Sequence, residues 1–147
     1  MAASDLARAT RALAFAARSL ERAAAARDLT LAQFRVLALV AAGDERSSLL
    51  ADRLAVAKPT ITAVVDGLVE RGLVARAAVA GDRRSIRLLL TPAGVAALRT
   101  AEREASAALA GILVHARDRD ALLAALADLD DALAARSQSR LRGEVRP

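Results

Sequence analysis

The segment from Ser47 to Gly72 constrains the fold most strongly, because it contains two short amphipathic stretches separated by a very tight connector. Apolar residues recur at helical spacing in both stretches. The connector is Ala55-Val56-Ala57, Pro59 suits the first turn of the second helix, and Gly72 suits the position just past its end. These features predict a helix-turn-helix. We expect the second helix to contribute these residues to the core: Ile61, Val64, Val65 and Leu68.

A β-hairpin is expected directly after the second helix, because the apolar period changes there from helical to alternating. Segment 73–79 is the weaker strand, since it is rich in alanine. Gly81-Asp82-Arg83-Arg84 lies at or near the hairpin tip. Between residues 71 and 87 the chain carries five arginines against one acidic residue, a net charge of +4 that favours a polyanionic partner. One side of the second strand is formed by Ile86, Leu88 and Leu90.

Further helices are expected on both sides of this unit. Thr30 and Gln33 fit a capping box at the start of one helix, and Gly43 fits its end. Thr91 and Pro92 open another, longer helix. Leucine stripes near both ends of the chain suit partner helices and usually mark an interface, so a two-fold homodimer is expected. The dimerisation residues are Leu6, Leu13, Leu20, Leu122, Leu126, Leu129 and Leu133.

Composition argues against several other functions. The chain has no cysteine and one histidine, so it lacks thiolate metal ligands, a thiol redox switch and the usual acid–base sets of an enzyme. We expect no enzyme activity, no cofactor and no metal site, and any effector is expected to be a non-redox ligand. No stretch is apolar enough to span a membrane, and charged residues occupy the place of a signal-peptide core. The expectation is a cytoplasmic protein without a membrane partner.

Four short motifs follow one another in the helix-turn-helix and hairpin region, between residues 58 and 94. They are K-P-T-x-T at 58–62, L-x-x-R-G-L at 68–73, D-R-R at 82–84 and L-T-x-A-G at 90–94. With these motifs, the block from Leu50 to Gly94 resembles the core of the MarR family of bacterial transcriptional regulators. The resemblance implies a homodimer that binds a palindromic operator in double-stranded DNA, most often as a repressor. It also implies a small-molecule effector bound between the DNA-binding and dimerisation regions.

The expected fold is mainly α-helical with a small β-hairpin wing, that is, a winged helix-turn-helix with N- and C-terminal dimerisation helices. Residues 1–28 form the N-terminal dimerisation helix, 29–92 the winged helix-turn-helix and 93–136 the C-terminal dimerisation helices. Residues 137–147 are rich in arginine and poor in apolar side chains, so a disordered tail is expected. The two aromatic residues, Phe15 and Phe34, mark a candidate ligand pocket with an otherwise aliphatic lining.

The predicted recognition helix offers few side chains for base contacts. Thr60 and Thr62 are short hydroxyl residues near its N-terminus and can reach base edges in the major groove, the alternative being ordinary helix-start hydrogen bonding. Lys58 is expected to meet a phosphate nearby. Related recognition helices commonly have T-R-x-x-D-R-L, whereas Ala63 and Gly67 replace both arginines here. A second hypothesis is therefore a dimeric protein-interaction module on the same fold that has lost sequence-specific DNA binding.

The hairpin supplies the remaining candidate DNA contacts. Arg84 suits the narrow minor groove, where the negative potential favours a planar guanidinium that Asp82 can orient. Arg83 is expected to contact a second phosphate, and Arg71 and Arg87 to support the hairpin from its flanks. The alternative is a solvated turn, because Gly-Asp is common turn chemistry.

Overall fold

The structure is a computed structural model that describes residues 2–25, 28–43, 46–79 and 82–141. Within these ranges the side chains of residues 48, 79, 82–85, 140 and 141 are not described. The chain order is α1 (Ala3–Ala25), α2 (Leu31–Ala41), α3 (Ser47–Leu54), α4 (Lys58–Glu70), β1 (Val74–Val79), β2 (Asp82–Leu90), α5 (Pro92–Leu113) and α6 (Arg119–Leu141).

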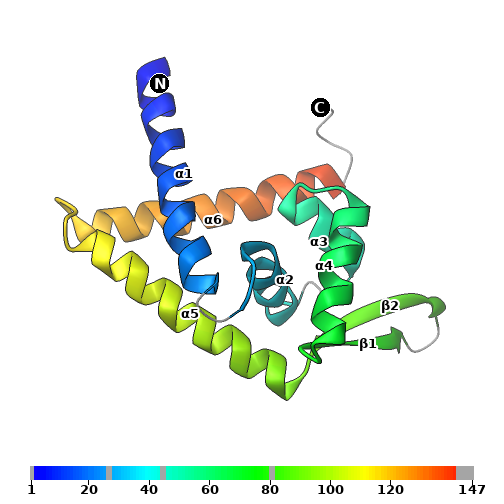
Figure 1. Cartoon of the computed structure of the whole chain (residues 1–147). Helices are drawn as coiled ribbons and strands as arrows, with labels where there is room; N and C mark the ends of the chain where they lie inside the picture. The colour runs from blue at the N-terminus through cyan, green and yellow to red at the C-terminus, as the bar shows by residue number, and fades with distance from the viewer. Residues whose placement is uncertain (1, 26–27, 44–45, 80–81, 142–147) are drawn as a thin grey trace.

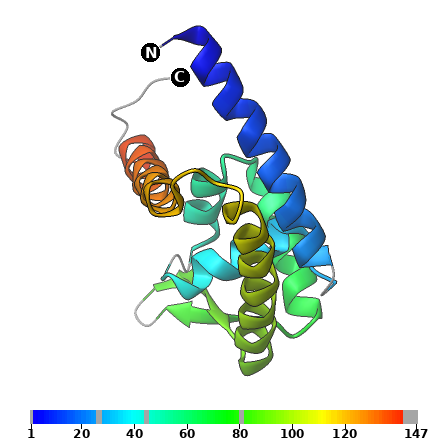
Figure 2. The same cartoon turned by 90° about the vertical axis from the view of Figure 1, so that its left-hand side faces the viewer.

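Helix α2 lies at the centre of the molecule, with α1 and α5 on one side and α3 and α4 on the other (Figure 1). The β1–β2 hairpin extends from the end of α4, while α6 runs across the opposite side and packs on α3. Figure 2 shows the first turns of α1 at the end of the molecule away from the hairpin. This arrangement is a winged helix-turn-helix with additional helices at both ends, which confirms the expected fold class. Among the described helices, none is long and apolar enough to cross a membrane.

The core forms where α2, α4 and the hairpin meet. Val36 and Leu37 of α2 are fully buried, and Leu88 of β2 is only 1 % exposed. On α4 the buried residues are Ile61, Val65 and Leu68, as the helical spacing predicted, and Val64 is partly buried beside them. Burial of this apolar surface is the main favourable contribution to folding and fixes the angle of α4 against the body.

The ends of α2 confirm the predicted capping. The backbone amide of Gln33 donates to Thr30 Oγ1 at 3.1 Å, and the backbone amide of Thr30 donates to the side-chain Oε1 of Gln33 at 3.0 Å. Gly43 follows the helix with a φ of +101°, a conformation that glycine adopts without steric cost.

The hairpin strands pair antiparallel from Val74 opposite Leu90 to Ala78 opposite Ile86. The register then shifts, and Val79 pairs with Asp82, so the hairpin is irregular near its tip. On the predicted apolar side Leu88 is buried, but Ile86 is 54 % exposed. Only the base of the hairpin, where Val74 pairs with Leu90, is therefore anchored in the core. The part from Ile86 to the tip extends away from the body.

Helix α6 continues beyond the end expected at residue 136, and the prediction of a disordered tail from residue 137 is wrong for its first part. Ser137 is buried at 7 % exposure, and its Oγ donates to the Leu133 carbonyl oxygen at 3.2 Å. The helix extends because this side packs near Phe34 and Leu54, a tertiary contact that the local composition does not reveal. The remaining tail, residues 142–147, lies outside the described residues.

Two of the sequence motifs meet where α5 begins. Thr91 Oγ1 donates to the Gly72 carbonyl oxygen at 2.6 Å, and the Thr91 amide donates to the Leu73 carbonyl oxygen at 3.1 Å. Thr91 Oγ1 also accepts from the Gly94 amide at 3.0 Å as the N-cap of α5. Gly94 lies so close to the backbone of Leu73, just before β1, that an added β-carbon would stand 1.9 Å from the Leu73 carbonyl oxygen. The R-G-L motif and the L-T-x-A-G motif thus form one junction.

The junction predicts a sharp difference between two glycines of α5. Gly94→Ala should lower the free energy of unfolding by about 1–3 kcal/mol, because the new methyl meets backbone that cannot move freely. Gly111→Ala is the matched control: no atom lies within 4 Å, so it should gain up to about 1 kcal/mol from helix propensity. Urea denaturation followed by circular dichroism measures both. Equal stability of Gly94→Ala and the unmodified protein would contradict the close packing.

Candidate nucleic-acid interface

The turn between α3 and α4 has the compact geometry expected of a helix-turn-helix. Ala55 adopts a left-handed conformation with φ of 53°. Its amide donates to the Asp52 carbonyl oxygen at 3.2 Å, and the Val56 amide donates to the Ala51 carbonyl oxygen at 3.1 Å. This pair of bonds ends α3 in the pattern that glycine usually completes. An alanine therefore carries steric strain at this position.

Helix α4 begins directly after the turn. Ala57 is its N-cap and provides no side-chain hydrogen bond, and Pro59 occupies the first turn as the sequence predicted. Lys58, Thr60 and Thr62 are all exposed. The Thr62 hydroxyl donates to the Lys58 carbonyl oxygen at 3.0 Å. This is the ordinary helix-start hydrogen bond that was the alternative to a base contact for Thr62. The Thr62 oxygen keeps its capacity to accept.

Two contacts attach α4 to its surroundings, and the sequence indicated neither. Arg76 of β1 forms an ion pair with Asp66 of α4, and about half of each side chain remains exposed. Arg71, at the end of α4, donates from Nη1 to the Asp28 carbonyl oxygen at 2.6 Å and to Gln33 Oε1 at 3.4 Å. Arg71 thus holds the connector before α2, and its expected contact with DNA stays a prediction.

The structure describes only part of the hairpin residues that were expected to contact DNA. The backbone of Asp82, Arg83 and Arg84 lies in β2, but their side chains, and the whole of Gly81, lie outside the described residues. Arg87 is exposed and stands opposite Ala77 of β1. The basic strand pairs with β1, which packs on α4, and the hairpin extends from the C-terminal end of that helix (Figure 1).

The structure does not bring Phe15 and Phe34 into one pocket. Phe15 is 76 % exposed. Phe34 lines a cavity of about 330 Å³ between α2, α3 and α6. A separate cavity of about 400 Å³ lies between α1, α5 and α6, and Arg35 is the one charged residue in its lining. Its aliphatic side chains are Leu13, Leu20, Leu109, Ile112, Leu126 and Leu133.

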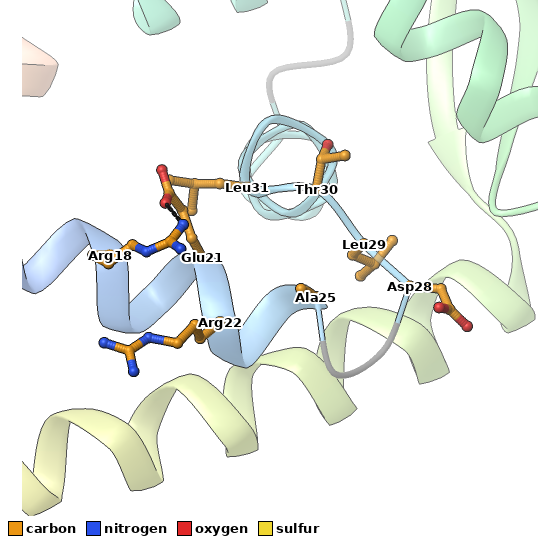
Figure 3. A pocket seen from close by; sticks show the side chains of 8 residues that line it. All are labelled: Arg18, Glu21, Arg22, Ala25, Asp28, Leu29, Thr30 and Leu31. Carbon is orange, nitrogen blue, oxygen red and sulfur yellow. Dashed lines mark hydrogen bonds and ion pairs between the residues drawn. The ribbon is translucent and has the colours of Figure 1, made fainter.

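A third hollow, of about 600 Å³, lies where α1 meets the start of α2 (Figure 3). Its wall includes an ion pair between Arg18 and Glu21 at 3.2 Å. The Asp28 carboxylate points away from that pair, while the backbone of the same residue is held by Arg71. Within the described part of the chain, no three His, Cys, Asp or Glu residues cluster in a way that could hold a metal ion.

Most of the leucines expected at a dimer interface are exposed in the single chain. Leu6 is 54 % exposed and Leu133 is 51 % exposed. Leu20 and Leu126 are partly buried and contribute to the aliphatic cavity instead. The others with large exposed surfaces are Leu13, Leu122 and Leu129.

Comparisons with known proteins agree on one family. The family model described as MarR family matches residues 27–85. The structure of the transcriptional repressor CouR bound to a 23-mer DNA duplex has 32 % sequence identity and a TM-score of 0.73, with 85 % of this chain and 89 % of that chain covered. The regulator MOSR of M. tuberculosis in complex with DNA has 30 % identity and a TM-score of 0.62, with 92 % and 97 % covered.

A further structure, CouR from Rhodococcus jostii RHA1 bound to p-coumaroyl-CoA, has 23 % identity and a TM-score of 0.72, with 85 % of this chain and 87 % of that chain covered. At this identity the likeness concerns the fold. No curated protein sequence matches the chain significantly.

The strained turn residue predicts a stabilising substitution. Ala55→Gly should raise the free energy of unfolding by about 0.5–1 kcal/mol, because glycine removes the left-handed strain although it enlarges the entropy of the unfolded chain. Ala63→Gly, on the exposed face of α4, is the same chemical change in a regular helix and should cost about 1 kcal/mol. Thermal and urea unfolding compare the two. Loss of stability in both variants would contradict the assigned turn.

Proposed function

This chain belongs to the MarR family of transcriptional regulators, and we propose that it acts as a homodimeric repressor that binds a palindromic operator through α4 and the β1–β2 hairpin. The carrying observation is that the exposed first turns of α4 belong to one unit with an arginine-rich hairpin, whose first strand packs on α4. The two relatives of at least 30 % identity were both solved with DNA, which supports DNA as the partner.

The proposed division of contacts follows the chemistry of each element. The first turns of α4 would enter the major groove, with Lys58 on a phosphate and Thr60 and Thr62 near base edges. Arg83 would neutralise a phosphate and Arg84 would enter the minor groove. The Arg76–Asp66 ion pair supports this arrangement because it ties the hairpin to α4.

A second copy of the chain is proposed to cover the exposed leucines of α1 and α6. These helices lie on the side of the molecule away from the hairpin, so a dimer formed there leaves α4 accessible in both copies (Figure 1). A two-fold axis between the copies would present two recognition helices to the two halves of a palindrome.

An effector is proposed to occupy the aliphatic cavity between α1, α5 and α6. Its lining favours an apolar group, and Arg35 could pair with an anionic group on the same ligand. The p-coumaroyl-CoA complex of a CouR protein supports ligand binding within this fold. Because the chain has no cysteine, the proposed control is non-redox.

The interaction-module hypothesis remains the alternative because of Ala63 and Gly67. Ala63 is exposed where the family commonly has an arginine. Gly67 lies near α2, where an added β-carbon would be 3.7 Å from Gln33 Nε2. A DNA mobility shift at two salt concentrations separates the two functions.

The hairpin prediction is tested by the salt dependence of DNA binding. Arg83→Ala should weaken binding to operator and random duplexes alike and lower the slope of log K against log salt by about 0.9, because one phosphate contact is lost. Arg117→Ala is the matched control, since it removes the same charge at the exposed α5–α6 turn, far from the hairpin (Figure 1). An unchanged slope in an Arg83→Ala, Arg84→Ala double variant with intact circular dichroism would favour the interaction module.

The dimer prediction is tested by mass in solution. Light scattering at micromolar concentration should give twice the mass of the chain. Leu129→Asp should shift the protein toward monomer and weaken operator binding in parallel, because a charge would be buried at the interface. Unchanged helical content by circular dichroism shows that the fold survives. A monomeric mass for the unmodified protein would contradict the proposed assembly.

A further inference from the structure

The exposed face of α4 combines an apolar strip with the polar side chains of Lys58, Thr60 and Thr62. Pro59 and Ala63 are exposed and lie four residues apart, so they share one side of the helix. Thr60 is exposed and neighbours Ala63 at a spacing of three. Val56, in the turn just before the helix, is 40 % exposed. Val56, Pro59 and Ala63, with the Thr60 methyl group, thus provide apolar surface on the exposed side of the turn and helix.

Two polar side chains of this helix have partners within the protein. The Thr62 hydroxyl donates its hydrogen to the Lys58 carbonyl oxygen. The Asp66 carboxylate pairs with Arg76 through Oδ1, which partly neutralises its charge and orients it toward the hairpin. Between residues 56 and 67 the sequence contains no arginine, asparagine or glutamine, and Lys58 is the one residue of the types that contact guanine O6 and N7 or adenine N6 and N7 in a bidentate manner.

In the major groove, the C5-methyl group of thymine is the apolar feature that distinguishes one base from the others, and alanine and threonine methyl groups contact it. We propose that α4 recognises its operator chiefly through apolar contacts of Thr60 and Ala63 with thymine methyl groups. This inference rests on the proposed DNA-binding function. Lys58 and the arginine-rich hairpin supply the positive charge that holds this apolar surface against DNA.

The test uses the full chain and an operator selected from random duplexes. Each thymine of the half-sites is then replaced by deoxyuridine, which lacks only the C5-methyl group. Loss of a buried methyl contact should weaken binding about fourfold at each contacted thymine. Guanines replaced by 7-deazaguanine, which lacks the N7 acceptor, provide the base control and should leave affinity unchanged.

A matched protein change removes the partner methyl. Thr60→Ser deletes one methyl group and keeps the hydroxyl, so it should weaken binding to the thymine operator about fourfold and leave binding to the deoxyuridine operator unchanged. Ala63→Gly should abolish the sensitivity at a second thymine. Its helix stability is checked by circular dichroism, and Thr60→Ser gives an independent result where Ala63→Gly does not fold.

The outcomes separate this inference from the proposed function. Full affinity for an operator in which every half-site thymine is deoxyuridine would overturn thymine recognition while leaving DNA binding intact. Equal effects of Thr60→Ser on both operators would also overturn it, since the two methyl groups would then not be in contact. Failure to select any duplex, at low and high salt, would overturn the proposed function and this inference together.

Discussion

The contact between Gly94 and Leu73 controls how the outer helices are attached to the helix-turn-helix. At this point α5 begins directly against the backbone that links α4 to β1, with no room for a β-carbon. At the same junction, the Thr91 hydroxyl donates to the Gly72 carbonyl oxygen and the Thr91 amide donates to the Leu73 carbonyl oxygen. The orientation of α5, and through it the side of the molecule proposed to dimerise, is therefore set by the end of the recognition helix. Packed backbone transmits displacement because it cannot be compressed.

A second attachment connects α4 to α1. Arg71 donates to the carbonyl oxygen of Asp28, and Asp28 has a left-handed φ of 55° just after the described end of α1. A movement of α1 that displaces Asp28 must either break this hydrogen bond or carry Arg71 with it. Because α1 also lines the aliphatic cavity, an effector bound there as proposed would act on the position of α4 through this hydrogen bond. The Arg76–Asp66 pair extends this connection to the hairpin.

Local sequence signals predicted the helices, the capping box and the hairpin correctly, because caps, periodicity and glycine positions act within a few residues. They did not predict contacts between distant segments. Arg71 and Asp28 lie 43 positions apart, and nothing near either residue indicates the other. The continuation of α6 past residue 136 depends on packing against α3. Phe15 and Phe34, the only aromatic residues, were expected to mark one ligand pocket, yet Phe15 lies on the surface of α1.

The same limits apply to the interface. Periodicity correctly identified which residues of α4 face the core, and hence that Thr60 and Ala63 face away from it. It could not show that Asp66 is neutralised by Arg76, and this pairing changes the chemistry of the surface. A free carboxylate would repel phosphates and could accept from cytosine, whereas a paired one does neither strongly. In the proposed complex with DNA, affinity would depend on the cations of the hairpin, and discrimination on the shape and methyl groups of α4.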